Sequence, residues 1–206
     1  MEDNEKLTHY LYGHEKEMLS LWKTLVETES GPKQPTGVES VRSLLAGELA
    51  AMGFTIRLQK VSGAPDLLIA ERGKEEGEGP IILSGHMDTV FPEGKASTCP
   101  FFIDEEGYAH GPGVLDMKGG LVVSLYAVKA LSALSLVTPP IKFVFVTDEE
   151  TLHMHSNAKA VLRREITGAK AFLNFEPCAE NGQVVLSRYG GGPAVSYTHL
   201  TLPTIR

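Results

Sequence analysis

Cysteine is scarce in this chain of 206 residues, which contains only Cys99 and Cys178. Two cysteines are too few for a disulfide framework, and neither lies in a Cys-x-x-Cys or Cys-His ligand spacing. We therefore expect two free thiols that take no part in the chemistry.

Positive charge is also in deficit, since 19 Lys and Arg face 26 Asp and Glu for a net charge of -7. A nucleic-acid or anionic-membrane partner calls for a basic patch, so we expect neither. The segment 1–6 is charged and no apolar core follows it, which predicts no signal peptide and a cytoplasmic location. Lys129 interrupts the apolar run 119–137, which favours a buried helix over a membrane span.

Apolar residues make up 42% of the chain, enough for a substantial core in one or two domains. Apolar side chains at three- and four-residue steps predict an amphipathic helix over 5–28. A second helix should follow, with Thr36 and Glu39 as a capping box and Gly53 as its stop.

Strand patterns alternate with helical ones along the rest of the chain. We expect a central strand at 81–83, covered on both faces, and a solvated hairpin loop at 73–79. The further strands are expected at 54–61, 66–71, 141–146 and 171–175, and a further helix at 157–164. This order predicts an α/β domain with a mainly parallel sheet, whose site lies beyond the carboxyl ends of the strands.

His86 and Asp88 stand where the central strand should end. If the strand period of two continues, both side chains project to one side, so that His86 can bind a metal through one nitrogen while Asp88 holds the other. The alternative is a hydrogen-bonded loop histidine. A glycine-rich segment at 110–120 then brings Asp116 to the start of the apolar helix, in a spacing that fits neither nucleotide-binding fingerprint.

Carboxylates occupy the corresponding place in other segments: Glu149 and Glu150 follow the strand at 141–146, and Glu176 follows the last strand. Imidazole with several carboxylates suits zinc, with manganese or cobalt as alternatives. Because one ion needs fewer carboxylates, we expect two ions about 3.5 to 4 Å apart, one bridging carboxylate and one acid left as general base.

Taken together, these motifs resemble the zinc exopeptidase and deacylase family of glutamate carboxypeptidase, acetylornithine deacetylase and succinyl-diaminopimelate desuccinylase. The resemblance covers most of residues 10–190 and rests on Ser84-Gly85-His86-Met87-Asp88-Thr89-Val90, Gly111-Pro112-Gly113-Val114-Leu115-Asp116-Met117-Lys118-Gly119-Gly120, Asp148-Glu149-Glu150 and Phe175-Glu176-Pro177. Among the subgroups, the chain most resembles glutamate carboxypeptidase. The resemblance implies a three-layer α/β/α fold with a mainly parallel mixed central sheet.

The same resemblance implies hydrolysis of an amide bond in a small peptide or an N-acyl amino acid, with two zinc ions. Carried over residue by residue, it makes His86 and Glu176 ligands of one ion, Asp88 the orienting partner of His86, Asp116 the bridging carboxylate, Glu150 a ligand of the second ion and Glu149 the general base. Deacylases such as acetylornithine deacetylase are the alternative enzyme, and a non-catalytic metal-binding or interaction module is the alternative class.

Parts of the family pattern are not matched. A lid or dimerisation domain and a last histidine ligand are expected after Arg188, so we interpret 1–190 as the N-terminal part of a catalytic domain and 191–206 as a truncated lid or a non-native tail. On this interpretation we expect the fragment to be inactive and the full-length parent to be a homodimer. His153 and His155 stand where the family has small residues, and they either replace the missing ligand, line the site entrance or face solvent.

Overall fold

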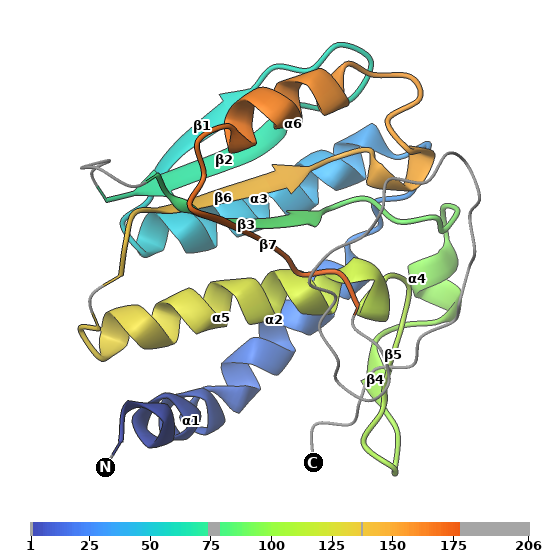
Figure 1. The fold of residues 1–206 in the computed structure, drawn as a ribbon. Coiled ribbons are helices and arrows are strands. Elements are labelled where there is room, and N and C mark those ends of the chain that lie inside the picture. The colour runs from blue at the N-terminus through green and yellow to red at the C-terminus, as the bar shows by residue number, and fades with distance from the viewer. Residues whose placement is uncertain (1, 74–78, 137, 178–206) are drawn as a thin grey trace.

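The computed structural model describes residues 2–73, 79–136 and 138–177. A five-stranded sheet forms the middle layer, with helices on both faces (Figure 1). Its strands are β1 Thr55–Gln59, β2 Leu67–Arg72, β3 Ile81–His86, β6 Ile141–Val146 and β7 Ala171–Asn174. The expected three-layer α/β/α architecture around a mixed sheet is confirmed.

The strand order is β1-β2-β6-β3-β7. β1 with β2 and β2 with β6 pair antiparallel, whereas β3 runs parallel to both of its neighbours, β6 and β7. The expectation of a hairpin at 73–79 is wrong, because β6 lies between β2 and β3. Residues 74–78 of that connection lie outside the described residues. The parallel half of the sheet is the half that ends in the polar segments.

Two apolar clusters hold the layers together. The larger joins α2 (Glu15–Glu27), α3 (Pro35–Ala51) and α5 (Gly119–Ala133) to one face of the sheet. The smaller packs α6 (Ala158–Ile166) on the other face. Alternate residues of β2 belong to different clusters, as the strand period of two requires. β3 is therefore covered on both sides, as its apolar sequence predicts.

The N-terminal segment forms two helices, α1 (Asp3–Gly13) and α2, so the prediction of one helix over 5–28 is wrong. His14 leaves the helical conformation at φ -111°, directly after Gly13, and its ring stacks on Tyr10. The apolar spacing continues through this break. The sequence pattern therefore does not reveal the break. The two helices differ in burial, since α2 buries residues in the core whereas α1 buries none completely.

The start of α3 also differs from expectation. Pro35 occupies its first turn and places Thr36 inside the helix, so the predicted capping box does not form. Gly53 ends this region as expected, with φ +80°, a conformation that glycine adopts without steric cost.

Between β3 and α5 the chain forms a short helix, α4 (Lys95–Thr98), and a small hairpin of β4 (Phe102–Ile103) with β5 (Ala109–His110). None of the helices in the described part of the chain combines the length and apolar character that a membrane crossing requires.

Candidate metal centre

His86 is the last residue of β3, and its side chain is only 1% exposed. The carbonyl oxygen of Asp88 lies 3.0 Å from His86 Nδ1, and the Asp88 carboxylate lies 3.4 Å from the same nitrogen. A carbonyl oxygen only accepts hydrogen bonds, so Nδ1 carries a hydrogen. In the neutral ring, Nε2 then holds the lone pair that a metal binds. The main chain of Asp88 is thus the nearer partner and its side chain the more distant one.

Asp116 approaches the ring from the irregular turn Val114–Lys118 that precedes α5. Its Oδ1 lies 2.8 Å from His86 Nε2. Gly120 makes this approach compatible with β7, because a Cβ at that position would lie 2.0 Å from the carbonyl oxygen of Phe175. The absence of a side chain at Gly120 therefore lets the start of α5 lie against the end of β7.

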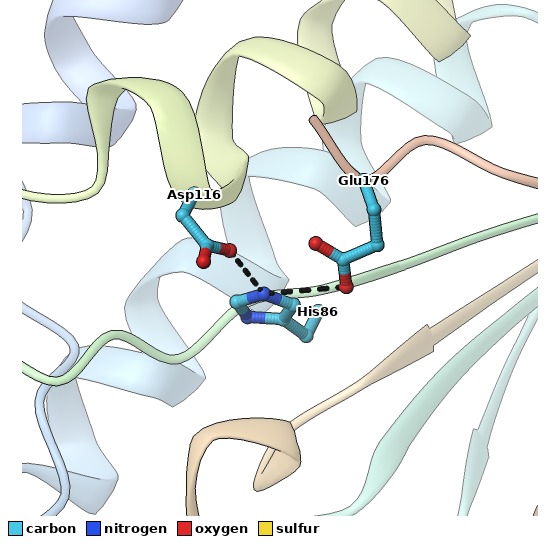
Figure 2. Close-up of side chains that lie close together, drawn as sticks. All are labelled: His86, Asp116 and Glu176. Carbon is cyan, nitrogen blue, oxygen red and sulfur yellow. Dashed lines mark hydrogen bonds and ion pairs between the residues drawn. The ribbon is translucent and has the colours of Figure 1, made fainter. Parts of the chain in front are cut away.

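Glu176 reaches the same nitrogen from the segment after β7, with Oε1 3.6 Å from His86 Nε2. Figure 2 shows both carboxylates pointing at the ring. One ligand atom each from His86, Asp116 and Glu176 lies within 4.8 Å of the others. The His86 imidazole is buried, whereas the Asp116 side chain is 55% exposed. Solvent therefore reaches the group from the side of Asp116.

Glu149 and Glu150 form the short 3₁₀ turn after β6. Their backbone N–H groups donate to the two carboxylate oxygens of Asp88, at 3.1 and 3.0 Å. Asp88 thereby connects the end of β3 to the acidic turn. Among the described residues, neither glutamate belongs to the group around His86 Nε2.

Negative charge is in excess around His86. Burial, and then the charges of Asp116 and Glu149, raise the pKa of Glu176 to about 7. Burial, with the charges of Asp116 and Asp88, raises the pKa of Glu150 to about 7. Burial lowers the pKa of His86, but hydrogen bonds to Asp116 and Asp88 outweigh it and hold that pKa well above its usual range.

Lys118 does not neutralise these acids, although it follows Asp116 by two residues. Its buried ammonium group donates to the carbonyl oxygen of Thr28 at 2.7 Å, and burial lowers its pKa to about 7. An imidazole nitrogen and carboxylate oxygens are the donors that zinc, cobalt and manganese accept. The residues present therefore fit a divalent metal ion in donor type, spacing and charge.

Sequence reasoning missed the role of Asp148. This acid precedes the two glutamates, and its carboxylate accepts hydrogen bonds from His153 Nδ1 at 2.7 Å and from the hydroxyl of Ser156. His153 thus contacts Asp148, and His155 is exposed. The run Leu-His-Met-His was the available signal, but a histidine next to a carboxylate motif does not say which carboxylate it binds.

Known proteins with similar sequences are metallopeptidases and deacylases, which agrees with the donor atoms of this site. Residues 82–200 match the model of peptidase family M20/M25/M40. Carboxypeptidase G2 of Pseudomonas sp. (strain RS-16) is 32% identical over 182 residues, which cover 86% of this chain and 42% of that protein. Acetylornithine deacetylase of Yersinia pseudotuberculosis is 34% identical over 144 residues, 65% of this chain and 37% of that protein.

Among solved structures, the di-peptidase Dug1p from Saccharomyces cerevisiae aligns with a TM-score of 0.73 at 16% identity, covering 85% of this chain and 41% of that one. At this identity the likeness concerns the fold alone. The chain spans about two fifths of the length of the proteins it matches.

Proposed function

Because this chain belongs to peptidase family M20/M25/M40, we propose that it holds a metal ion between His86, Asp116 and Glu176, and that the whole protein hydrolyses an amide bond with this metal. The observation that most supports this proposal is that two carboxylates lie near Nε2 of the buried His86. The other ring nitrogen, Nδ1, is held by a main-chain carbonyl oxygen. That arrangement selects the tautomer a metal needs.

We propose zinc as the metal, with cobalt and manganese as the alternatives that the same donors accept. A second ion would be held by Glu150, with Asp116 shared between the two. The excess of carboxylates over cationic side chains supports this, because one divalent ion would leave part of the negative charge uncompensated. Bound metal would supply Lewis acidity toward a carbonyl oxygen and lower the pKa of water.

Glu149 is proposed as the general base. It would accept a proton from the attacking water and return it to the leaving amine. Two features support this assignment. Its backbone N–H donates to Asp88, and its charge acts on Glu176, although among the described residues it does not belong to the group of His86, Asp116 and Glu176. Asp88 then orients His86 and the acidic turn together.

The substrate class we propose is a peptide or an N-acyl amino acid. The match to carboxypeptidase G2 extends over more of this chain than the match to acetylornithine deacetylase, which favours a carboxypeptidase. Release of glutamate from an N-acyl glutamate, compared with deacetylation of N-acetylornithine, by the whole protein would distinguish the two.

Metal binding is the direct test on this chain. Calorimetric titration of the metal-free protein with Zn²⁺ or Co²⁺ should show saturable binding, and Co²⁺ should give the visible absorption of a site with nitrogen and oxygen donors. In the whole protein, Glu149→Gln should retain the metal and lose turnover. A chain that binds neither ion, or a Glu149→Gln enzyme with parental turnover, would contradict the proposal.

Three further expectations stand as proposals. The division into 1–190 and 191–206 falls in a part of the chain outside the described residues. A cytoplasmic location of the whole protein is the second proposal. Homodimerisation of the whole protein through a further domain is testable by sedimentation analysis.

A further inference from the structure

The segment that follows the acidic turn has an unusual backbone. Leu152 and His153 are consecutive residues with φ of +54° and +53°, the left-handed region that residues other than glycine rarely adopt. Two such residues in succession persist only where the surrounding structure holds them. Here the chain turns back immediately after Glu149 and Glu150.

His153 is the residue whose side chain folds back across this turn. Its Nδ1 lies 2.7 Å from Asp148 Oδ1, and the two side chains are 11% and 10% exposed. Its backbone N–H also donates to the carbonyl oxygen of Asp148 at 3.2 Å. His153 therefore links the segment after the two glutamates to Asp148, the residue that precedes them.

The second carboxylate oxygen of Asp148 connects this turn to the next helix, α6. It accepts the hydroxyl of Ser156, whose oxygen in turn accepts the N–H of Ala158, the first residue of α6. On the other side of the turn, Asp88 accepts the N–H groups of Glu149 and Glu150. The acidic turn is thus held at its start by Asp88 and at its end by the Asp148–His153 pair.

We propose that His153 is a positioning residue: by holding Asp148 it maintains the left-handed turn and so sets the direction in which Glu149 and Glu150 face the metal centre. The inference rests on the proposed function for the roles of those two glutamates, but the positioning itself does not. It replaces the hypothesis of His153 as a substitute metal ligand, because among the described residues His153 lies outside the group of His86, Asp116 and Glu176.

The positioning can be tested without metal, by residue-resolved hydrogen exchange of the Glu149 and Glu150 amides in the metal-free chain. His153→Ala should accelerate both amides about tenfold or more, because the turn opens locally when its closing bond is lost. His153→Asn should restore slow exchange, since the Asn amide N–H occupies the place of Nδ1 and Asn tolerates the left-handed conformation. His153→Gln, whose amide lies one methylene further out, should behave like His153→Ala.

A metal titration then separates positioning from general destabilisation. His153→Ala should weaken uptake of the second equivalent of Co²⁺ about 10- to 100-fold, the effect of removing a group that supports a ligand, and leave the first equivalent unchanged. His153→Asn should recover the second equivalent. Equal weakening of both equivalents would instead indicate a merely structural role.

Parental exchange rates in His153→Ala overturn the inference, whatever the metal does. A parent chain that binds no metal contradicts the proposed function, while the exchange data still decide the role of His153. If His153→Ala does not fold, the Asn and Gln variants carry the comparison, and equal exchange in both overturns the inference.

Discussion

Two clusters of carboxylates lie on this one sheet, and they differ in how their charge is balanced. The first, the bridge cluster, consists of Glu71 and Glu165 with Arg57 and Lys142. Glu165 lies 2.8 Å from both cations, and Glu71 lies 3.1 Å from Lys142. The second, the site cluster, consists of Asp88, Asp116, Glu149, Glu150 and Glu176 around His86.

Their pKa shifts run in opposite directions. Burial raises the pKa of Glu165, but hydrogen bonds and charge from Arg57 and Lys142 outweigh it and leave that pKa below its usual range. In the site cluster, burial and neighbouring acids raise the pKa of Glu150 and Glu176 to about 7. A structural cluster supplies its own cations, whereas a cluster that lacks them fits a cation from solution.

The largest expected difference concerns metal affinity. His86→Ala removes the one nitrogen donor of the site cluster and should weaken binding of the first Zn²⁺ by more than about 100-fold, beyond the loss caused by a supporting group. Calorimetry measures this directly. Glu165→Gln is the matched control in the bridge cluster and should bind Zn²⁺ like the parent. Comparable losses in the two variants would remove the distinction between the clusters.

The next difference concerns pH. Glu150 and Glu176, whose pKa is about 7 without metal, must lose their protons to bind it, and so must His86, whose pKa is held well above its usual range. Zn²⁺ affinity should therefore fall as the pH drops below 7, by about tenfold per pH unit for each competing proton. Titrations at pH 8, 7 and 6 give the slope. A flat profile across that range would mean that these acids are not ligands.

The bridge cluster should respond only at lower pH. The pKa of Glu165 is lower in the folded chain than its ordinary value of 4.5, so its contribution to stability is present above pH 4.5 and is lost as the pH falls through the folded value. Urea unfolding at pH 7, 5 and 3 measures this loss.

A smaller effect is expected on stability, with opposite signs in the two clusters. Glu165→Gln leaves Arg57 and Lys142 without their shared partner and should lower the free energy of unfolding by about 1–2 kcal/mol, a value reduced by the partial exposure of Arg57. Glu150→Gln removes a charge that its surroundings disfavour and should raise that free energy by roughly 1 kcal/mol at pH 8 without metal, after allowance for solvent screening.

Urea unfolding of the two variants in a chelator at pH 8 gives this comparison. The same sign for both substitutions would contradict it.

The smallest effect is expected at the edge of the bridge cluster. The Glu71 side chain is 45% exposed and lies 3.8 Å from Arg57, so solvent screens its interactions. Glu71→Gln should change the free energy of unfolding by less than about 0.5 kcal/mol. A loss equal to that of Glu165→Gln would show that the cluster acts as one cooperative network.

Local sequence patterns predicted much of this fold. Alternation and apolar runs located the strands, and the prediction of 141–146 agrees with β6 at both ends. Strand order was not predictable in the same way, because the insertion of β6 between β2 and β3 depends on pairing between distant residues. Nor did the helical period over 5–28 reveal the break at His14, where the apolar spacing continues although the backbone does not.

The metal group was predictable because each member follows a strand or precedes a helix, and parallel strands end at one edge. The grouping of His86, Asp116 and Glu176 agrees with that expectation, whereas their roles stay predictions. The partnership of Asp148 with His153 was not predictable, since it depends on two consecutive left-handed residues that no glycine marks in the sequence.

The pairing of β3 with both β6 and β7 has a consequence for how the chain folds. The metal group draws on the end of β3, the turn before α5 and the segment after β7, so it cannot exist until the last described strand has joined β3. Closing such long loops is slow compared with forming local helices. An ion cannot therefore nucleate this domain. Metal uptake followed in time should coincide with the final step of sheet assembly, and its rate would report that step.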